Sequence, residues 1–483
     1  MLNHRGRRDH RDRDHHRPGR AQLTYRAGWF YRRAPWCAGW LTAAGWAAAF
    51  PLVSGLGPHR SWGAIAATGY LAAAVAVLVL PWRRARSWSV AVALLGALAL
   101  PLLRLVLTGQ GQSEVAVIER SAELLLRHGT PYLADPHTVS EYTPYLPGMA
   151  LFGLPRAVLG AQEWPARLLG DARLWCAAAF LGCLFAAGRR HRPALAALTA
   201  SPLVALPLCV SGVDLPMTGL CCLALALAAR GRPGAAGAAL AAACALKWTA
   251  WPAVAVVAAL LAATAGRRAA LRATAVALAG TAVLVLPGAL RSPGPMFHQV
   301  FAFPTGRGPL PTPAGSPLPG RLLADLGPAG WYAAVTLLLL AGLAVAASLV
   351  LRPPRDAVGA ADRLALGLCV AFLLAPAGRF GYLALPLLLT LWARSQARTA
   401  PRTGALADAL TDPRTDPLTD PRTEVAPTPW PAHSSSPMTS RPGRAASKPS
   451  STPWPPVCPP TRSSSSPRTS PAPPRTTRPS PSR

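Results

Sequence analysis

The feature that most constrains this chain is the repetition of long apolar runs. Runs of about 16–22 residues recur from Trp36 to Trp392, and each is close to the length that an α-helix needs to cross ~30 Å of hydrocarbon. Charged residues make up only 14% of the 483 residues, whereas soluble domains carry about 25%. The sequence therefore predicts an all-α, polytopic helical membrane protein.

The apolar pattern predicts about 12 or 13 membrane spans. Twelve of them cover residues 35–54, 63–81, 88–108, 171–188, 194–212, 215–230, 234–247, 250–265, 273–290, 331–351, 362–377 and 380–393. The thirteenth candidate, 146–160, contains Pro147 and Pro155, which interrupt a helix. A partial or re-entrant segment is favoured there, because a full crossing would move the basic loop at 189–192 to the outer side.

The net charge of +30 is spread over short loops and both tails. This pattern is typical of the positive-inside rule and predicts a bacterial plasma-membrane protein with both termini in the cytoplasm. Residues 1–34 are then a basic cytoplasmic segment, 35–395 the membrane domain, and 396–483 a disordered cytoplasmic tail rich in Pro, Ser, Thr and Arg. The loops 109–170 and 291–330 face outward. No nucleic-acid-binding module accompanies the basic residues, so membrane lipids are the expected partners of the tails.

Acidic residues are concentrated in the first outer loop. No Asp or Glu lies between Asp14 and Glu114. The cluster that follows consists of Glu114, Glu119, Glu123, Asp135 and Glu141. Carboxylates are costly near hydrocarbon, so a cluster at a membrane edge indicates a candidate functional site.

The first part of this loop predicts an amphipathic helix over residues 114–127 that lies on the membrane surface. Ser113 is suited to cap its start and Gly129 to end it. Glu119 and Glu123 lie on its polar face and are expected to be solvated. The apolar face comprises Val115, Ile118, Ala122, Leu125 and Leu126.

Among the acids, Glu114 is the first candidate for a general base, because it lies at both the end of a span and the start of a helix. Its alternative role is a first-turn acid favoured by the helix dipole. Asp135, Glu141 and Asp214 are secondary candidates. Asp135 and Glu141 could also bind a metal with a nearby His, but their spacing is loose. No metal or other cofactor is therefore expected.

Three outward cations could bind a phosphate. Lys247 is the only lysine of the apolar region, whereas Arg307 and Arg379 lie in Gly-containing outer segments. Each has an ordinary alternative as an interface cation. Tyr132 and His298 are candidates for orienting an acceptor. The nine cysteines contain no CxxC pair, so neither a disulfide framework nor a zinc site is implied.

The order of these motifs resembles the GT-C superfamily of membrane glycosyltransferases, and most closely glycosyltransferase family 87, over roughly residues 88–393. In that family an Asp opens the first outer loop, and Gly-x-Pro-Tyr and Tyr-x-Pro follow. This chain has Glu114, then HGTPY, then TPYLPG, and later ALKWTAWP and PAGRFGY. Two departures are the Glu in place of the Asp and two additional spans before the one that leads into the loop.

The resemblance implies an inverting hexosyltransferase of the extracytoplasmic face, with a polyprenyl-phosphate sugar, most simply mannose in an actinobacterium, as donor. Glu114 would deprotonate the acceptor, and Lys247 with an outer-loop Arg would stabilise the leaving phosphate. A glycolipid, a lipoglycan or a protein would be the acceptor. The alternative is a non-enzymatic protein, either a lipid or sugar transporter or an inactive scaffold of the same fold. Transporters more often show internal repeats and mid-bilayer charges. No internal repeat is evident here, and Arg104 is the only charged residue well inside a predicted span.

Overall fold

The computed structural model describes residues 18–188 and 192–397, with side chains from residue 31 onward. Within these ranges the regular structure is helical, apart from one isolated parallel bridge between Gly315 and Gly378. The predicted all-α membrane architecture is therefore confirmed. The predictions made for residues 1–17 and 398–483 lie outside the described residues.

The first helices pack around an aromatic and alanine-rich core. They are α1 (Pro18–Val53), α2 (Gly57–Val79), α3 (Trp82–Leu94), the π-helix η1 (Leu95–Ala99) and α4 (Leu100–Leu107). Helices α2 and η1 cross closely, because a Cβ on Gly69 would lie 2.6 Å from the Cα of Gly96. The buried Tyr70 hydroxyl donates a 2.8 Å hydrogen bond to the carbonyl of Ala200, which fastens this group to the next helices.

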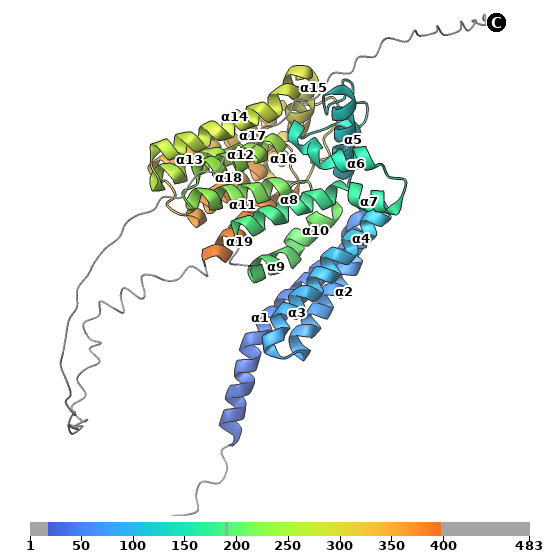
Figure 1. Ribbon diagram of the computed structural model, residues 1–483, viewed down its shortest axis with the longest axis vertical. Helices are drawn as coiled ribbons and strands as arrows, with labels where there is room; N and C mark the ends of the chain where they lie inside the picture. Colours follow the sequence, from blue (N-terminus) through green and yellow to red (C-terminus); the bar gives the residue numbers. More distant parts are fainter. Residues whose placement is uncertain (1–17, 189–191, 398–483) are drawn as a thin grey trace, which may run out of the picture. The chain divides into compact units, whose positions relative to one another are not determined.

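The middle of the chain forms the central bundle (Figure 1). Its elements are α8 (Ala172–Ala187), α9 (Arg192–Ala200), α10 (Pro202–Val210), α11 (Leu215–Ala229), α12 (Pro233–Leu246), the 3₁₀ turn η5 (Trp248–Ala250), α13 (Pro252–Thr264) and α14 (Arg267–Arg291). Ala and Leu make up most of the buried core, and Gly219 and Gly237 lie directly against the neighbouring helices α8 and α14. Small side chains let helix backbones approach closely, which is how helices associate in a lipid environment.

The last described part of the chain adds three more helices to the bundle and several short outer turns. Its elements are α15 (Pro293–Phe297), the π-helix η6 (His298–Ala302), the 3₁₀ turn η7 (Phe303–Thr305), α16 (Pro319–Ala324), α17 (Pro328–Leu351), α18 (Ala357–Leu374), the 3₁₀ turn η8 (Phe380–Leu383) and α19 (Ala384–Ala397). The Pro- and Gly-rich segment 291–330 is thus broken into short pieces by its composition.

Among the described helices, six are long and apolar enough to cross a membrane. Counting each bent pair, α7–α8 and α9–α10, as one span raises the number to eight. The predicted 12 or 13 spans exceed this count. Helices α11, α12 and α13 are apolar but have only 15, 14 and 13 residues, because α11 ends before Arg230, α12 before Lys247 and α13 before Ala265.

The first outer loop contains the predicted amphipathic helix. The elements of this loop are α5 (Ser113–His128), η2 (Val139–Glu141), η3 (Pro147–Gly153), α6 (Leu154–Leu159) and α7 (Trp164–Gly170). Helix α5 ends at Gly129, whose φ of 72° is left-handed as predicted. The predicted cap is wrong: Ser113 is the first helical residue, and Gln112 occupies the cap position without a side-chain cap bond. The side chain of Gln112 instead contacts His59 at 2.7 Å.

The segment 146–160 forms η3 and α6, which have 7 and 6 residues and are each too short to cross a bilayer. This agrees with the favoured partial segment. Helix α5 packs its apolar side on η3, where Gly153 lies directly against the backbone of Glu119.

The two outer segments also bind one another. The buried Gln299 accepts a hydrogen bond from the Thr143 amide at 2.9 Å and donates one to the Leu133 carbonyl at 2.6 Å. Figure 1 shows α5, α6 and α15 at the same end of the bundle helices.

Gly153→Ala should destabilise the fold by about 1–3 kcal/mol, the cost of overpacking a close contact. The added Cβ would lie 2.8 Å from the Cα of Glu119 and would also clash with the carbonyl of Ile118. Gly182→Ala is the matched control, since a Cβ there meets nothing within 4 Å. Denaturant unfolding of the protein in detergent measures both. Equal free energies of unfolding for wild type and Gly153→Ala would contradict the observed packing.

Candidate functional site

A cavity of about 230 Å³ lies where the outer segments meet the ends of the bundle helices. Part of its lining comes from the start of α5 and from the loops at 139–145, 303–305 and 312–314. Another part is apolar and consists of Leu203, Pro207, Leu338, Phe372, Leu385 and Leu388. The cavity therefore combines a charged lining with an apolar one.

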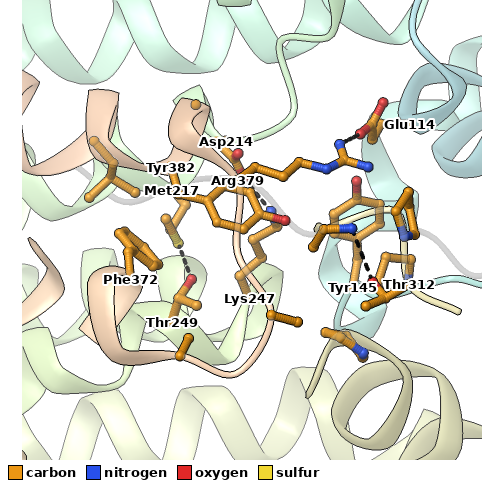
Figure 2. Close-up of a pocket in the computed structure, with 18 of the residues that line it drawn as sticks. Glu114, Tyr145, Asp214, Met217, Lys247, Thr249, Thr312, Phe372, Arg379 and Tyr382 are labelled. Atoms are coloured by element: carbon orange, nitrogen blue, oxygen red, sulfur yellow. Dashed lines mark hydrogen bonds and ion pairs between the residues drawn. The ribbon is translucent and has the colours of Figure 1, made fainter. Parts of the chain in front are cut away.

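Two ion pairs cross this cavity (Figure 2). The Arg379 guanidinium donates to the carboxylate of Glu114, and the Lys247 ammonium donates to the carboxylate of Asp214. The Glu114 and Lys247 side chains are only 16% and 15% exposed. Three residues predicted separately as base and phosphate ligands, together with one secondary acid, thus line the same cavity.

Each of these charged residues lies at an interruption of helical structure. Glu114 is in the first turn of α5, and Asp214 directly precedes α11. Lys247 is extended, with φ −147° and ψ 139°, between α12 and η5. Arg379 is extended directly before η8. Helix ends place these charges at the rim of the apolar bundle, where burial costs less than at its centre.

The charges also determine which groups stay ionised. Burial is the largest single influence and lowers the pKa of Arg379. The Glu114 carboxylate together with the phenols of Tyr382 and Tyr145 outweighs it, so the pKa of the guanidinium lies above its usual value. Burial raises the pKa of the Tyr145 phenol, and the carboxylates of Glu114 and Asp214 raise it further. Arg379 is therefore a permanent cation beside a phenol that keeps its proton.

Two tyrosine rings flank the Lys247 ammonium. Its Nζ lies 4.9 Å from the ring centroid of Tyr145 and 5.9 Å from that of Tyr382. Aromatic faces stabilise a desolvated cation at such distances. Sequence reasoning missed both roles, although both tyrosines belong to the TPYLPG and RFGY segments that it singled out.

Tyr132 has a supporting role beside the cavity. Its side chain is buried, and its hydroxyl donates a 2.9 Å hydrogen bond to the backbone carbonyl of Tyr145. It does not line the cavity. Tyr132 therefore holds a cavity residue in place and does not itself reach an acceptor in this structure.

Four other candidates also lie outside the cavity lining. Asp135 is exposed and lies 3.7 Å from His137. Glu141 accepts hydrogen bonds from two backbone amides at the start of η2, which lower its pKa. Arg307 stacks on Trp331, with the guanidinium carbon 4.0 Å from the ring centroid. His298 is exposed.

The expected solvated role of Glu119 is wrong. Its carboxylate accepts from the Ala172 amide at 3.2 Å and pairs with Arg156 at 3.2 Å, and the side chain is 19% exposed. Burial raises the pKa of Glu119, and the Arg156 cation offsets only part of that rise. Glu119 thus joins α5 to α6 and α8. Glu123 is half-exposed and pairs with Arg127 on the same helix, as a polar face predicts.

A buried arginine that the sequence reasoning did not identify lies behind the cavity. Arg173 is 1% exposed and forms a bidentate pair with Asp171. Its Nη1 also donates 2.8 Å hydrogen bonds to the carbonyls of Gln110 and Cys209. The Arg173 guanidinium therefore holds together the two backbone segments that lead to Glu114 and to Asp214. The sequence does contain a signal for this pair, because the charged triplet DAR stands at the start of an apolar run.

No group of three His, Cys, Asp or Glu side chains that could hold a metal ion occurs in the described parts of the chain. The eight cysteines described there are free thiols. The chemistry that this arrangement offers is that of its charged and phenolic side chains: proton transfer by a carboxylate, and binding of an oxyanion by two cations.

Arg173→Met should destabilise the fold by about 3–5 kcal/mol, because it leaves the buried Asp171 carboxylate without its partner. Arg321→Met removes a half-exposed pair with Asp325 and should cost less than about 1 kcal/mol. Unfolding curves in detergent measure the difference. A similar small cost for both variants would show that Arg173 does not support the site.

The chain was compared with protein-family models, with curated proteins and with solved structures, and none of the three comparisons finds a match. The function is therefore inferred from the cavity itself. Its distinguishing features are the two ion pairs, the two tyrosine rings that face Lys247, and the apolar part of the lining.

Proposed function

We propose that this chain is an integral membrane glycosyltransferase that moves a hexose from a polyprenyl-phosphate donor to an acceptor. The observation that carries the proposal is the convergence of Glu114, Asp214, Lys247 and Arg379 on one cavity with an apolar interior. Carboxylates supply a base and cations supply a phosphate site, and glycosyl transfer from a phosphate needs both.

The reaction follows from these roles. A donor phosphate that reaches the cavity competes with Glu114 for Arg379 and with Asp214 for Lys247. The released Glu114 carboxylate takes the proton of the acceptor hydroxyl, whose oxygen forms a bond to the anomeric carbon. The bond from that carbon to the phosphate oxygen breaks, and its electron pair leaves with the lipid phosphate. Attack opposite to the leaving group inverts the anomeric centre.

The apolar depth of the cavity supports a lipid-linked donor. Leu385 and Leu388 lie on α19, and Leu203 and Pro207 lie on α10, so this lining continues along the bundle helices away from the charged residues. A nucleotide sugar would leave this surface without a partner. A prenyl chain would cover it, at about 25 cal/mol for each Å² of apolar surface removed from water.

The position of the charges supports action on the extracytoplasmic face of a bacterial plasma membrane. Asp214 lies at the N-terminal end of α11, whereas Arg230 lies at its C-terminal end. Basic turns favour the cytoplasmic side, which leaves the cavity on the outer side. Mannose is the first sugar to test, and a glycolipid, a lipoglycan or a protein remains open as the acceptor.

Membranes that contain the protein should transfer sugar from polyprenyl-phosphate-mannose, and Glu114→Gln should lower the rate by about 10²–10⁴-fold, the usual contribution of a positioned base. The control is Glu123→Gln, since Glu123 is half-exposed on α5 and, among the residues that the structure describes, pairs with Arg127 alone. Its rate should match the wild type. Radiolabelled product in the lipid fraction measures both.

The same assay separates the alternatives. Transfer that Glu114→Gln retains and Asp214→Asn loses would move the base to Asp214. A folded wild-type protein that transfers no sugar from a panel of polyprenyl-phosphate donors would contradict the proposal and favour a transporter or an inactive scaffold.

A further inference from the structure

The cavity contains a buried donor that the proposed reaction leaves unused. Tyr145 is only 3% exposed, yet it lines the cavity. Among the described residues its hydroxyl has no hydrogen-bonding partner, whereas its backbone carbonyl is bonded to Tyr132. The hydroxyl is not among the buried side-chain atoms that lack a partner, so it is open to the cavity and available to donate a hydrogen bond to a ligand there.

A second phenol has the same property. Tyr382 is half-buried, lies on η8 just after Arg379, and lines the same cavity. Its hydroxyl also has no hydrogen bond to another described residue. Figure 2 shows both tyrosine side chains reaching into the space between the Glu114–Arg379 pair and the Asp214–Lys247 pair.

We propose that Tyr145 and Tyr382 are oxyanion-binding residues, which donate hydrogen bonds from their hydroxyls to the oxygens of a phosphate monoester held by Lys247 and Arg379. A phosphate oxygen is the acceptor that this donor set lacks, because both neighbouring carboxylates pair with the cations and neither hydroxyl bonds to them among the described residues. The phosphate is the headgroup of a lipid, so this inference rests on the proposed function for its ligand class.

The surroundings of Tyr145 favour a hydroxyl that donates a hydrogen bond over one that loses its proton and acts as a base. Burial and the carboxylates of Glu114 and Asp214 hold its pKa well above the usual range, so the hydroxyl keeps its proton. Its ring faces the Lys247 ammonium at 4.9 Å, which fixes where the hydroxyl points. The contact with Lys247 therefore orients Tyr145, and the hydroxyl remains available to a ligand.

The test is binding of farnesyl phosphate to the purified full-length protein in detergent, followed by thermal shift and titration. Tyr145→Phe keeps the ring and its contact with Lys247 and removes only the hydroxyl. It should weaken farnesyl phosphate binding about 10-fold or more, as expected for a hydrogen bond to a charged acceptor, and Tyr382→Phe should weaken it less. Tyr332→Phe is the control, because Tyr332 is 58% exposed and outside the cavity lining.

Two further probes identify what the hydroxyls recognise. Farnesol lacks the phosphate, and its weaker binding should be the same in the wild type and in Tyr145→Phe. Inorganic phosphate should compete with farnesyl phosphate if both occupy this site, and tighter binding of the prenyl ester identifies the lipid headgroup as the source. Equal farnesyl phosphate affinity in the wild type and Tyr145→Phe, or an equal loss for farnesol, would overturn the inference.

Binding is measured without transfer, so the two proposals fail separately. Tyr145-dependent binding of farnesyl phosphate by a protein that transfers no sugar would overturn only the transferase. Sugar transfer by a protein whose Tyr145→Phe variant binds farnesyl phosphate like the wild type would overturn only the role of the hydroxyls.

Discussion

The structure depends on the pairing of charges at the edge of an apolar bundle. Two carboxylates and two cations line a cavity whose other walls are largely apolar, where an isolated ion is costly. Glu114 pairs with Arg379 and Asp214 with Lys247, and each pair joins segments that are 265 and 33 residues apart. The pairing neutralises the cavity while keeping four charged groups within reach of a ligand.

That pairing in turn depends on the buried support behind it. Arg173 bonds to the carbonyls of Gln110 and Cys209, which precede the two carboxylates in the chain. The amide of Gln112 also donates to the carbonyl of Val210 at 2.8 Å. These bonds hold two backbone segments at fixed positions, so the carboxylates face one cavity. A ligand that binds both cations thus meets a preformed site, which lowers the ordering cost of binding.

Local patterns could be predicted from the sequence, whereas long-range pairings could not. The apolar runs, the amphipathic α5 and its end at Gly129 follow from periodicity and from glycine geometry. Glu114, Lys247 and Arg379 were recognisable as unusual charges beside apolar segments. Their ion pairs were not, because partners so distant in sequence leave no mark on local spacing.

The failures have the same cause. Glu119 falls on the polar face of α5 in a helical projection, but α6 and α8 cover it. Arg307 lies in a candidate outer loop, but Trp331 holds its guanidinium outside the cavity. Tertiary contacts decide whether such residues are buried or solvated. A helical projection shows the surface of one helix and not the segments that pack on it.

The most direct measurement is an experimental structure of the protein in a lipid nanodisc with a polyprenyl-phosphonate sugar, in which a carbon replaces the oxygen between the anomeric carbon and phosphorus, so that the sugar cannot be transferred. The phosphonate should lie between Lys247 and Arg379, with Arg379 released from Glu114 and the prenyl chain along α10 and α19. A phosphonate bound elsewhere, with both ion pairs intact, would contradict the proposed donor site.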